Sequence, residues 1–167
     1  FTTSTLQQEA VRKLHFSVSK TMRLAQSLYE GGHITYMRTD SIRVSEVAQA
    51  SAREYIKAYF GEESTPKNAR NYKVAAEAQD AHEAIRPSDV TIEPSKIKKY
   101  LTPDQFKLYK LIWERFMASL MADQIQNTCQ VDITANGYLF KASGYTVKFD
   151  GHTALYVEGK DEKDDEN

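Results

Sequence analysis

A tyrosine and an arginine lie two residues apart in the segment from Gly31 to Ser41. The β-branched residues around them favour an extended backbone, in which side chains at positions i and i+2 point the same way. Tyr36 and Arg38 can therefore face one substrate. A phenol can act as a nucleophile, and a guanidinium can hold a phosphate group through two hydrogen bonds. Together these two side chains predict attack on a phosphodiester.

An unreactive role fits the same spacing. The pair could lie in a short strand before a helix, with the tyrosine half-buried and the arginine in a surface ion pair. Two neighbouring features favour chemistry instead. Thr39 and Asp40 place a hydroxyl and a carboxylate in the next turn, and the paired glycines at 31–32 allow the backbone to approach a ligand closely.

A second candidate group lies in the segment 79–87, where His82 and Arg86 precede Pro87. This pattern fits a short helical turn, closed by proline, with an ordinary surface histidine. It also fits a second set of phosphate-contacting side chains. The sequence offers no competing chemistry, because it contains no Gly-rich phosphate loop, no G-x-S-x-G elbow and no H-E-x-x-H motif.

The composition limits the class of protein. Of the 167 residues, 41% are hydrophobic and 27% are charged, which is a globular composition able to bury a core. No apolar run approaches the roughly 18 residues of a membrane span, so we expect no membrane partner and a cytoplasmic location. Cys129 is the only cysteine, which excludes an intrachain disulfide and a thiolate zinc site.

The charge distribution separates the chain into a body and a tail. The net charge is −1, but the last ten residues carry six acidic and two basic side chains. The body is therefore mildly basic, which is compatible with a nucleic-acid surface. The chain begins with Phe1 rather than Met and shows no signal peptide, so we expect a piece of a longer protein.

The elements that must position the candidate side chains are predicted to be mostly helical. Hydroxyl caps, glycine stops and apolar residues at helical spacing predict helices from Ser4 to about His15, from Ser19 to Gly31, from Ser45 to Gly61, and from Thr102-Pro103-Asp104-Gln105 onward. The apolar positions of the second helix are Met22, Ala25, Leu28 and Tyr29. Those of the third are Val44, Val47, Ala48, Tyr55, Ile56, Tyr59 and Phe60. Those of the last are Phe106, Tyr109, Ile112, Trp113, Phe116, Met117 and Leu120.

The hydrophobic period changes from helical to two near the end of the chain. Cys129, Val131 and Ile133 alternate with polar residues, and Asn136-Gly137 predicts a two-residue hairpin turn of type I′. An isolated hairpin is only marginally stable. We therefore expect these strands to belong to a β domain whose other strands lie outside this chain.

The expected fold is mainly α with a small antiparallel β portion. We divide it into a helical domain at 1–125, the strands at 126–157 and an acidic linker at 158–167. Between the third and last helices, residues 62–95 lack a steady period and hold three prolines. Such a long connection predicts a functional or mobile loop.

Three segments of this sequence resemble landmarks of the type IA DNA topoisomerases, in the order of that family. They are Phe1-Thr2-Thr3-Ser4-Thr5-Leu6-Gln7-Gln8, Ile34-Thr35-Tyr36-Met37-Arg38-Thr39-Asp40-Ser41 and Ala81-His82-Glu83-Ala84-Ile85-Arg86-Pro87. Met37, beside the tyrosine, resembles the bacterial topoisomerase I branch more than topoisomerase III, where proline is usual. The resemblance covers about residues 1–155.

The resemblance implies a role for each landmark. Tyr36 matches the nucleophile that forms a 5′-phosphotyrosyl link to cleaved single-stranded DNA. Arg38 matches the arginine that contacts the scissile phosphate, and His82 matches a histidine that contacts DNA near the active site. Further DNA contacts are expected at Thr35, Thr39, Asp40 and Arg86. The family's tyrosine domain is largely helical and of helix-turn-helix-like type, and its neighbour is a β-rich arch.

The family's Toprim domain, with its Mg²⁺-binding acidic cluster, matches nothing in this sequence. The resemblance therefore implies a fragment that is inactive alone, with Mg²⁺ bound outside it. It implies ATP-independent relaxation of negatively supercoiled DNA through single-strand cleavage. The implied partners are single-stranded and supercoiled DNA and the missing Toprim and arch domains of the same polypeptide. A monomer in the bacterial cytoplasm, associated with the nucleoid, is expected.

Two other interpretations stay open at this point. A non-catalytic DNA-binding module of helix-turn-helix type would bind DNA in a salt-dependent way without using the tyrosine. A tyrosine recombinase would need further arginine and histidine partners within one chain, and no such set can be placed in this sequence.

Overall fold

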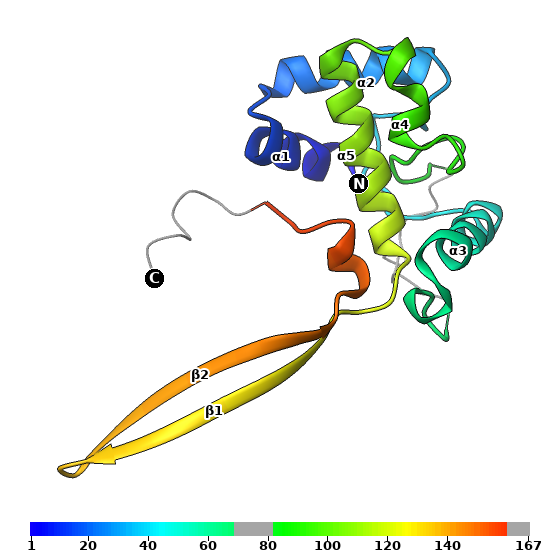
Figure 1. Ribbon diagram of the computed structural model, residues 1–167. Coiled ribbons are helices and arrows are strands. Elements are labelled where there is room, and N and C mark those ends of the chain that lie inside the picture. Colours follow the sequence, from blue (N-terminus) through cyan, green and yellow to red (C-terminus); the bar gives the residue numbers. More distant parts are fainter. Residues whose placement is uncertain (69–81, 160–167) are drawn as a thin grey trace.

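The structure is a computed structural model that describes residues 1–68 and 82–159. A helical body carries a long two-stranded ribbon that projects away from it (Figure 1). The helices are α1 (Thr3–Leu14), α2 (Val18–Glu30), α3 (Glu46–Phe60), α4 (Pro94–Ile97) and α5 (Pro103–Ser119). The strands are β1 (Ile125–Ala135) and β2 (Tyr138–Phe149), and short 3₁₀ turns lie at Glu62–Ser64, Lys98–Tyr100 and Gly151–Ala154. The expected fold class, mainly α with a small antiparallel β portion, is confirmed.

Residues 69–81 and 160–167 lie outside this description. They include the first part of the segment 79–87, much of the expected loop and most of the expected acidic linker. What the sequence predicts for these residues therefore stays a prediction.

Two helices begin earlier than the sequence predicts. Thr2, not Ser4, caps α1: its hydroxyl accepts from the Thr5 amide, and the Thr5 hydroxyl accepts from the Thr2 amide at 2.8 Å. Ser17, not Ser19, caps α2 and accepts from the Lys20 amide at 3.3 Å. At each of these two helix starts, the sequence has two hydroxyl residues close together. The earlier one accepts a hydrogen bond from a backbone amide that has no partner within the helix.

The other helix boundaries agree with the sequence. Ser45 caps α3 and Gly61 ends it, while Gly31 ends α2. The capping box of α5 is complete, because the Thr102 amide donates to Gln105 Oε1 at 2.9 Å and the Thr102 hydroxyl accepts in return. These boundaries were predictable because a cap involves only residues within one helical turn.

The buried stripe predicted for α3 is only partly correct. Tyr55 and Ile56 are buried together with the small residues Ala48 and Ala52. Val47 and Tyr59 are instead 80% and 64% exposed. A helix at the edge of the body buries one narrow face, so apolar residues beside that face remain in solvent.

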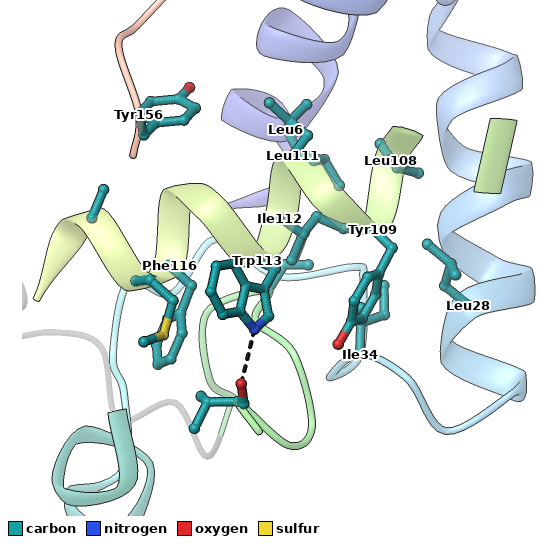
Figure 2. Close-up of a cluster of buried hydrophobic side chains, with 14 of the residues drawn as sticks. Leu6, Leu28, Ile34, Leu108, Tyr109, Leu111, Ile112, Trp113, Phe116 and Tyr156 are labelled. Atoms are coloured by element: carbon teal, nitrogen blue, oxygen red, sulfur yellow. Dashed lines mark hydrogen bonds between the residues drawn. The ribbon is translucent and has the colours of Figure 1, made fainter. Parts of the chain in front are cut away.

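Helix α5 is the centre of the hydrophobic core (Figure 2). Its buried residues include Leu108, Tyr109, Leu111, Ile112, Trp113, Phe116 and Met117. They belong to one cluster with Leu6 of α1 and Leu28 of α2. Trp113 Nε1 donates to the Val90 carbonyl at 3.0 Å, and the Tyr109 hydroxyl donates to the Ile92 carbonyl at 2.6 Å. These two bonds attach the connection before α4 to α5.

The ribbon is a single antiparallel pair whose turn has the predicted geometry. Asn136 and Gly137 have positive φ angles of 49° and 81°, as a type I′ turn requires. The register pairs Ile133 with Phe140 and Asp132 with Lys141. Because side chains alternate along a strand, these two pairs lie on opposite faces. The face of Ile133 is mainly apolar near the turn, whereas the face of Asp132 is mixed and also carries Leu139 and Tyr145; most of both faces is exposed.

After the ribbon the chain returns to the helical body. Tyr156 is buried, and its hydroxyl donates to the buried carboxylate of Glu9 in α1. The Gly159 amide donates to the same carboxylate at 3.2 Å. Lys13 Nζ lies 4.0 Å from the centre of the Tyr156 ring, and the Arg115 guanidinium lies 5.1 Å from it. The segment around Tyr156 is thus bound to both α1 and α5.

Candidate active site

Along the segment that carries Tyr36 and Arg38, side chains alternate between solvent and interior. Tyr36, Arg38 and Asp40 are exposed, whereas Met37 and Thr39 are buried. The predicted extended segment is reduced to an isolated bridge at Ile34, and the chain bends at Thr35, Met37 and Arg38. The phenol of Tyr36 and the guanidinium of Arg38 are nevertheless both accessible from solvent.

Thr35 joins this segment to the one that contains His82 and Arg86. Its amide donates to the Arg86 carbonyl at 2.9 Å. Its hydroxyl donates to the Ala84 carbonyl at 2.8 Å and accepts from the Arg86 amide at 3.0 Å. An isolated antiparallel bridge between Ile34 and Pro87 continues the pairing. The two candidate segments are therefore neighbours, although about fifty residues separate them in the chain.

The N-terminal residues complete the site from the other side. The Thr3 hydroxyl donates to the Met37 carbonyl at 2.8 Å and accepts from the Thr39 amide at 2.9 Å. The Thr3 amide donates to the Thr39 carbonyl at 2.8 Å, and the Ile85 amide donates to the Phe1 carbonyl at 2.8 Å. All three segments singled out in the sequence are thus hydrogen-bonded to one another.

The guanidinium of Arg86 is hydrogen-bonded within the protein. Its guanidinium donates to Glu83 Oε2 from Nε at 3.2 Å and from Nη2 at 2.5 Å, and to the Pro87 carbonyl at 3.1 Å. The other Glu83 oxygen accepts from the amide of Ser45, the cap of α3, at 2.9 Å. Burial works against the charged form, but Arg86 and Ser45 hold the pKa of Glu83 below its ordinary value. This pair ties the segment to α3, and a DNA contact of Arg86 stays a prediction.

The remaining candidates differ in how free their side chains are. Thr35 and Thr39 use their hydroxyls within the protein, since Thr39 Oγ1 accepts from the Ser41 amide at 3.0 Å. Arg38 is exposed and makes no hydrogen bond or ion pair with the residues that the structure describes. Asp40 and His82 are exposed as well. The guanidinium of Arg38 is therefore available to an incoming phosphate.

Sequence reasoning missed one residue at this site. Tyr29 belongs to the apolar positions of α2, yet it is 41% exposed, and Tyr36 is 42% exposed. The centres of the two rings are 5.3 Å apart, with an angle of 70° between the ring planes. Its place in the sequence was the available signal: Tyr29 is the next-to-last residue of α2, and the paired glycines that follow the helix lead into the Tyr36 segment.

Neither a metal centre nor a membrane span is found in the part of the chain that the structure describes. Within residues 1–68 and 82–159, no three His, Cys, Asp or Glu side chains lie together so as to hold a metal ion. Over the same ranges, no helix has the length and apolar character needed to cross a membrane.

Comparison with known proteins identifies similar chains. A family model described as DNA topoisomerase matches residues 1–167. Among solved structures, the full-length topoisomerase I from Thermotoga maritima is 42% identical to this chain, with a TM-score of 0.80. The match covers 96% of this chain but only 29% of that one. The chain thus spans less than a third of the length of that solved relative.

Proposed function

The chain belongs to the DNA topoisomerase family, within its bacterial type IA branch, and on this premise we propose that Tyr36 is the nucleophile that cleaves a DNA strand. The observation that carries the proposal is the placement of Tyr36 and Arg38. Both are exposed, two residues apart, in a segment whose backbone is hydrogen-bonded to two other segments. A substrate phosphate can therefore reach a phenol and a free guanidinium at one place.

The proposed step conserves the phosphodiester bond energy. The phenolic oxygen of Tyr36 attacks the phosphorus, and the bond from phosphorus to the 3′ oxygen breaks. The 5′ phosphate becomes attached to Tyr36, the phenol loses its proton, and the leaving 3′ oxygen gains one. Resealing is the reverse reaction, so no ATP is consumed.

Arg38 serves this step electrostatically. A phenol is ordinarily protonated at neutral pH, because its reference pKa is about 10. A nearby positive charge favours the phenolate and stabilises the charge that develops on the phosphate oxygens. No described side chain stands out as the donor to the leaving oxygen, and we assign that donor to the missing Toprim domain. We propose that the same domain would hold the Mg²⁺ that the resemblance implies.

The test of the nucleophile is the variant Tyr36→Phe in the full-length parent enzyme. Phenylalanine keeps the ring and removes only the attacking oxygen. We expect no covalent adduct with a single-stranded oligonucleotide, while Tyr100→Phe, at another exposed tyrosine, forms adducts as the wild type does. Adducts that persist in Tyr36→Phe would refute the assignment. The alternative, a non-catalytic DNA-binding module, predicts salt-dependent binding with no adduct in any variant.

The test of Arg38 is its replacement by lysine. Lysine keeps the charge but cannot make the paired hydrogen bonds of a guanidinium. We expect Arg38→Lys to cleave more slowly than the wild type, with Arg23→Lys on the exposed surface of α2 as the matched control. Wild-type cleavage by Arg38→Lys would remove this residue from the mechanism.

We further propose that the strands β1 and β2, which end at Phe149 within the β portion expected at 126–157, form part of a β-rich arch domain that the rest of the parent chain completes. Support comes from the ribbon itself, because Val131, Ile133, Tyr138 and Phe140 form an exposed apolar face. Support also comes from the length of the solved relative, most of which this chain does not span. Amide exchange along β1 and β2 should be slower in the parent enzyme than in this chain alone. Equal exchange rates would contradict the proposal.

The activity of the whole enzyme follows from the same assignment. We propose that the parent relaxes negatively supercoiled DNA in the bacterial cytoplasm, as a monomer associated with the nucleoid. This chain alone lacks the other domains and is expected to leave a supercoiled plasmid unchanged in Mg²⁺. Relaxation by the highly purified chain would show that it carries the complete machinery.

A further inference from the structure

The backbone of Tyr36 is held on both sides, but its side chain is not. On one side, both the amide and the hydroxyl of Thr35 are hydrogen-bonded to the segment at 84–86. On the other side, Met37 is buried and its carbonyl accepts from Thr3. The hydroxyl of Tyr36 makes no hydrogen bond with the residues that the structure describes. Rotation about the Tyr36 side-chain bonds is thus not restricted by any polar contact in this part of the chain.

Tyr29 supplies an apolar restraint. Its ring meets the Tyr36 ring edge to face, with 5.3 Å between ring centres and 70° between planes. This is a favoured arrangement for two aromatic rings, because the positive edge of one meets the negative face of the other. The contact limits the rotamers that Tyr36 can adopt.

Tyr29 is itself firmly placed. It lies in the last turn of α2, next to Leu28, which is fully buried in the core. The Tyr29 carbonyl accepts from the Gly32 amide at 2.8 Å, and the Leu28 carbonyl accepts from the His33 amide at 2.9 Å. Gly32 has a φ of 74°, which glycine adopts without strain. The turn between the two tyrosines is therefore fixed by backbone hydrogen bonds.

We propose that Tyr29 is a positioning residue, whose ring holds the Tyr36 phenol in the orientation from which it attacks the DNA phosphate. The proposal rests on the function proposed above for Tyr36. In-line attack requires one orientation of the phenolic oxygen, and a freely rotating side chain spends only part of its time there. An edge-to-face pair of this kind shifts a rotamer population by about 2- to 10-fold. Loss of the Tyr29 ring therefore slows cleavage by that factor.

The experiment compares three replacements of Tyr29 in the full-length parent enzyme. Phenylalanine keeps the ring and removes the hydroxyl, leucine keeps much of the volume without the ring, and alanine removes both. The cleavage rate is measured in single turnover at saturating single-stranded oligonucleotide. DNA affinity is measured separately in a Tyr36→Phe background, which isolates binding from cleavage. Tyr100→Ala is the control, because Tyr100 is 72% exposed and makes no aromatic contact with Tyr29 or Tyr36.

We expect Tyr29→Ala and Tyr29→Leu to cleave about 2- to 10-fold more slowly than the wild type with unchanged affinity. We expect Tyr29→Phe and Tyr100→Ala to cleave at the wild-type rate. Wild-type cleavage by Tyr29→Ala would overturn the proposal. If Tyr29→Phe cleaved as slowly as Tyr29→Ala, the Tyr29 hydroxyl rather than its ring would be responsible. If Tyr29→Ala weakened DNA binding but left the cleavage rate unchanged, Tyr29 would be a DNA contact. Both results would reject positioning by the ring.

A second measurement does not depend on the chemistry of Tyr36. Fluorotyrosine placed at position 36 of the parent enzyme reports the mobility of that ring by ¹⁹F NMR. Tyr29→Ala should narrow and shift this signal, whereas Tyr29→Phe should leave it unchanged. An unchanged signal in Tyr29→Ala would overturn the proposal. Adducts that persist in Tyr36→Phe would instead refute the function of Tyr36, so the two failures are distinguishable.

Discussion

Thr35 offers the sharpest test of how the site is assembled. Its hydroxyl joins the Tyr36 segment to the segment at 84–86. It donates to the Ala84 carbonyl at 2.8 Å and accepts from the Arg86 amide at 3.0 Å. Replacement by valine substitutes a methyl group of similar size for this hydroxyl. The variant therefore removes two hydrogen bonds and leaves the packing almost unchanged. No other described group bonds to the Ala84 carbonyl or the Arg86 amide.

The expected loss of stability follows from these two bonds. An intramolecular hydrogen bond contributes about 1 kcal/mol net, and a buried group left without its partner costs about 1–3 kcal/mol. Thr35 is half-buried, so water reaches part of the site. We therefore expect Thr35→Val to lower the free energy of unfolding by about 2 kcal/mol. For a chain of this length, that corresponds to a Tm lower by about 4–8 °C.

The assay is thermal unfolding of the chain, followed by near-ultraviolet circular dichroism. The matched control is Thr134→Val, at an exposed threonine of β1 whose hydroxyl makes no hydrogen bond with the described residues. The control should change stability by less than about 0.5 kcal/mol. Amide exchange at Arg86 should also accelerate in Thr35→Val, because this amide loses its acceptor.

Two results would refute this reasoning. An unchanged Tm in Thr35→Val would show that the hydroxyl does not hold the two segments together. A normal Tm with weakened DNA binding would make Thr35 a DNA contact, as its place in the sequence first suggested. A lower Tm with normal DNA affinity would show that Thr35 holds the two segments together and does not contact DNA.

Two further predictions concern the base of the ribbon and the segment that returns from it. Gly151 has a φ of 53°, and a Cβ there would lie 2.5 Å from the carbonyl carbon of Asp123, so Gly151→Ala should destabilise the chain by more than about 1–2 kcal/mol. Gly144→Ala, which meets nothing within 4 Å, should be nearly neutral, and equal Tm values for the two variants would contradict the prediction. Burial raises the pKa of Tyr156 above its ordinary value of 10.0, so its stabilising contribution is complete below pH 10 and is lost as pH rises beyond it. Urea midpoints between pH 8 and 11 should fall less steeply in Tyr156→Phe than in the wild type, and parallel slopes would contradict this.

Local features of the fold were predictable from the sequence. The ends of α3, the capping box of α5 and the turn at Asn136-Gly137 each depend on residues within a few positions of one another. The starts of α1 and α2 were placed too late, because neighbouring hydroxyl residues compete for the same role. Propensity alone does not separate such candidates.

The predicted core was correct where a helix is surrounded by other elements. Along α5, Tyr109, Ile112, Trp113 and Phe116 are all buried, as their helical spacing indicates. Along α3, the same reasoning predicted that Val47 is buried, but Val47 lies in solvent. Hydrophobic spacing identifies an apolar face, but the width of that face depends on the neighbours that the fold provides.

By itself, the sequence indicated that Tyr36 and Arg38 share an environment that differs from that of Met37 between them, and in the structure the first two are exposed and Met37 is buried. It also determined the helix ends that local caps specify and the hairpin that its turn residues require. Only the tertiary structure decided that Thr3 bonds to Met37 and Thr35 to Ala84, that Glu83 accepts from Ser45, and that the Tyr29 ring lies against Tyr36. Such contacts join residues far apart in the chain or on separate elements. They form only when burial of the α5 core brings those elements together, and no short-range pattern encodes that arrangement.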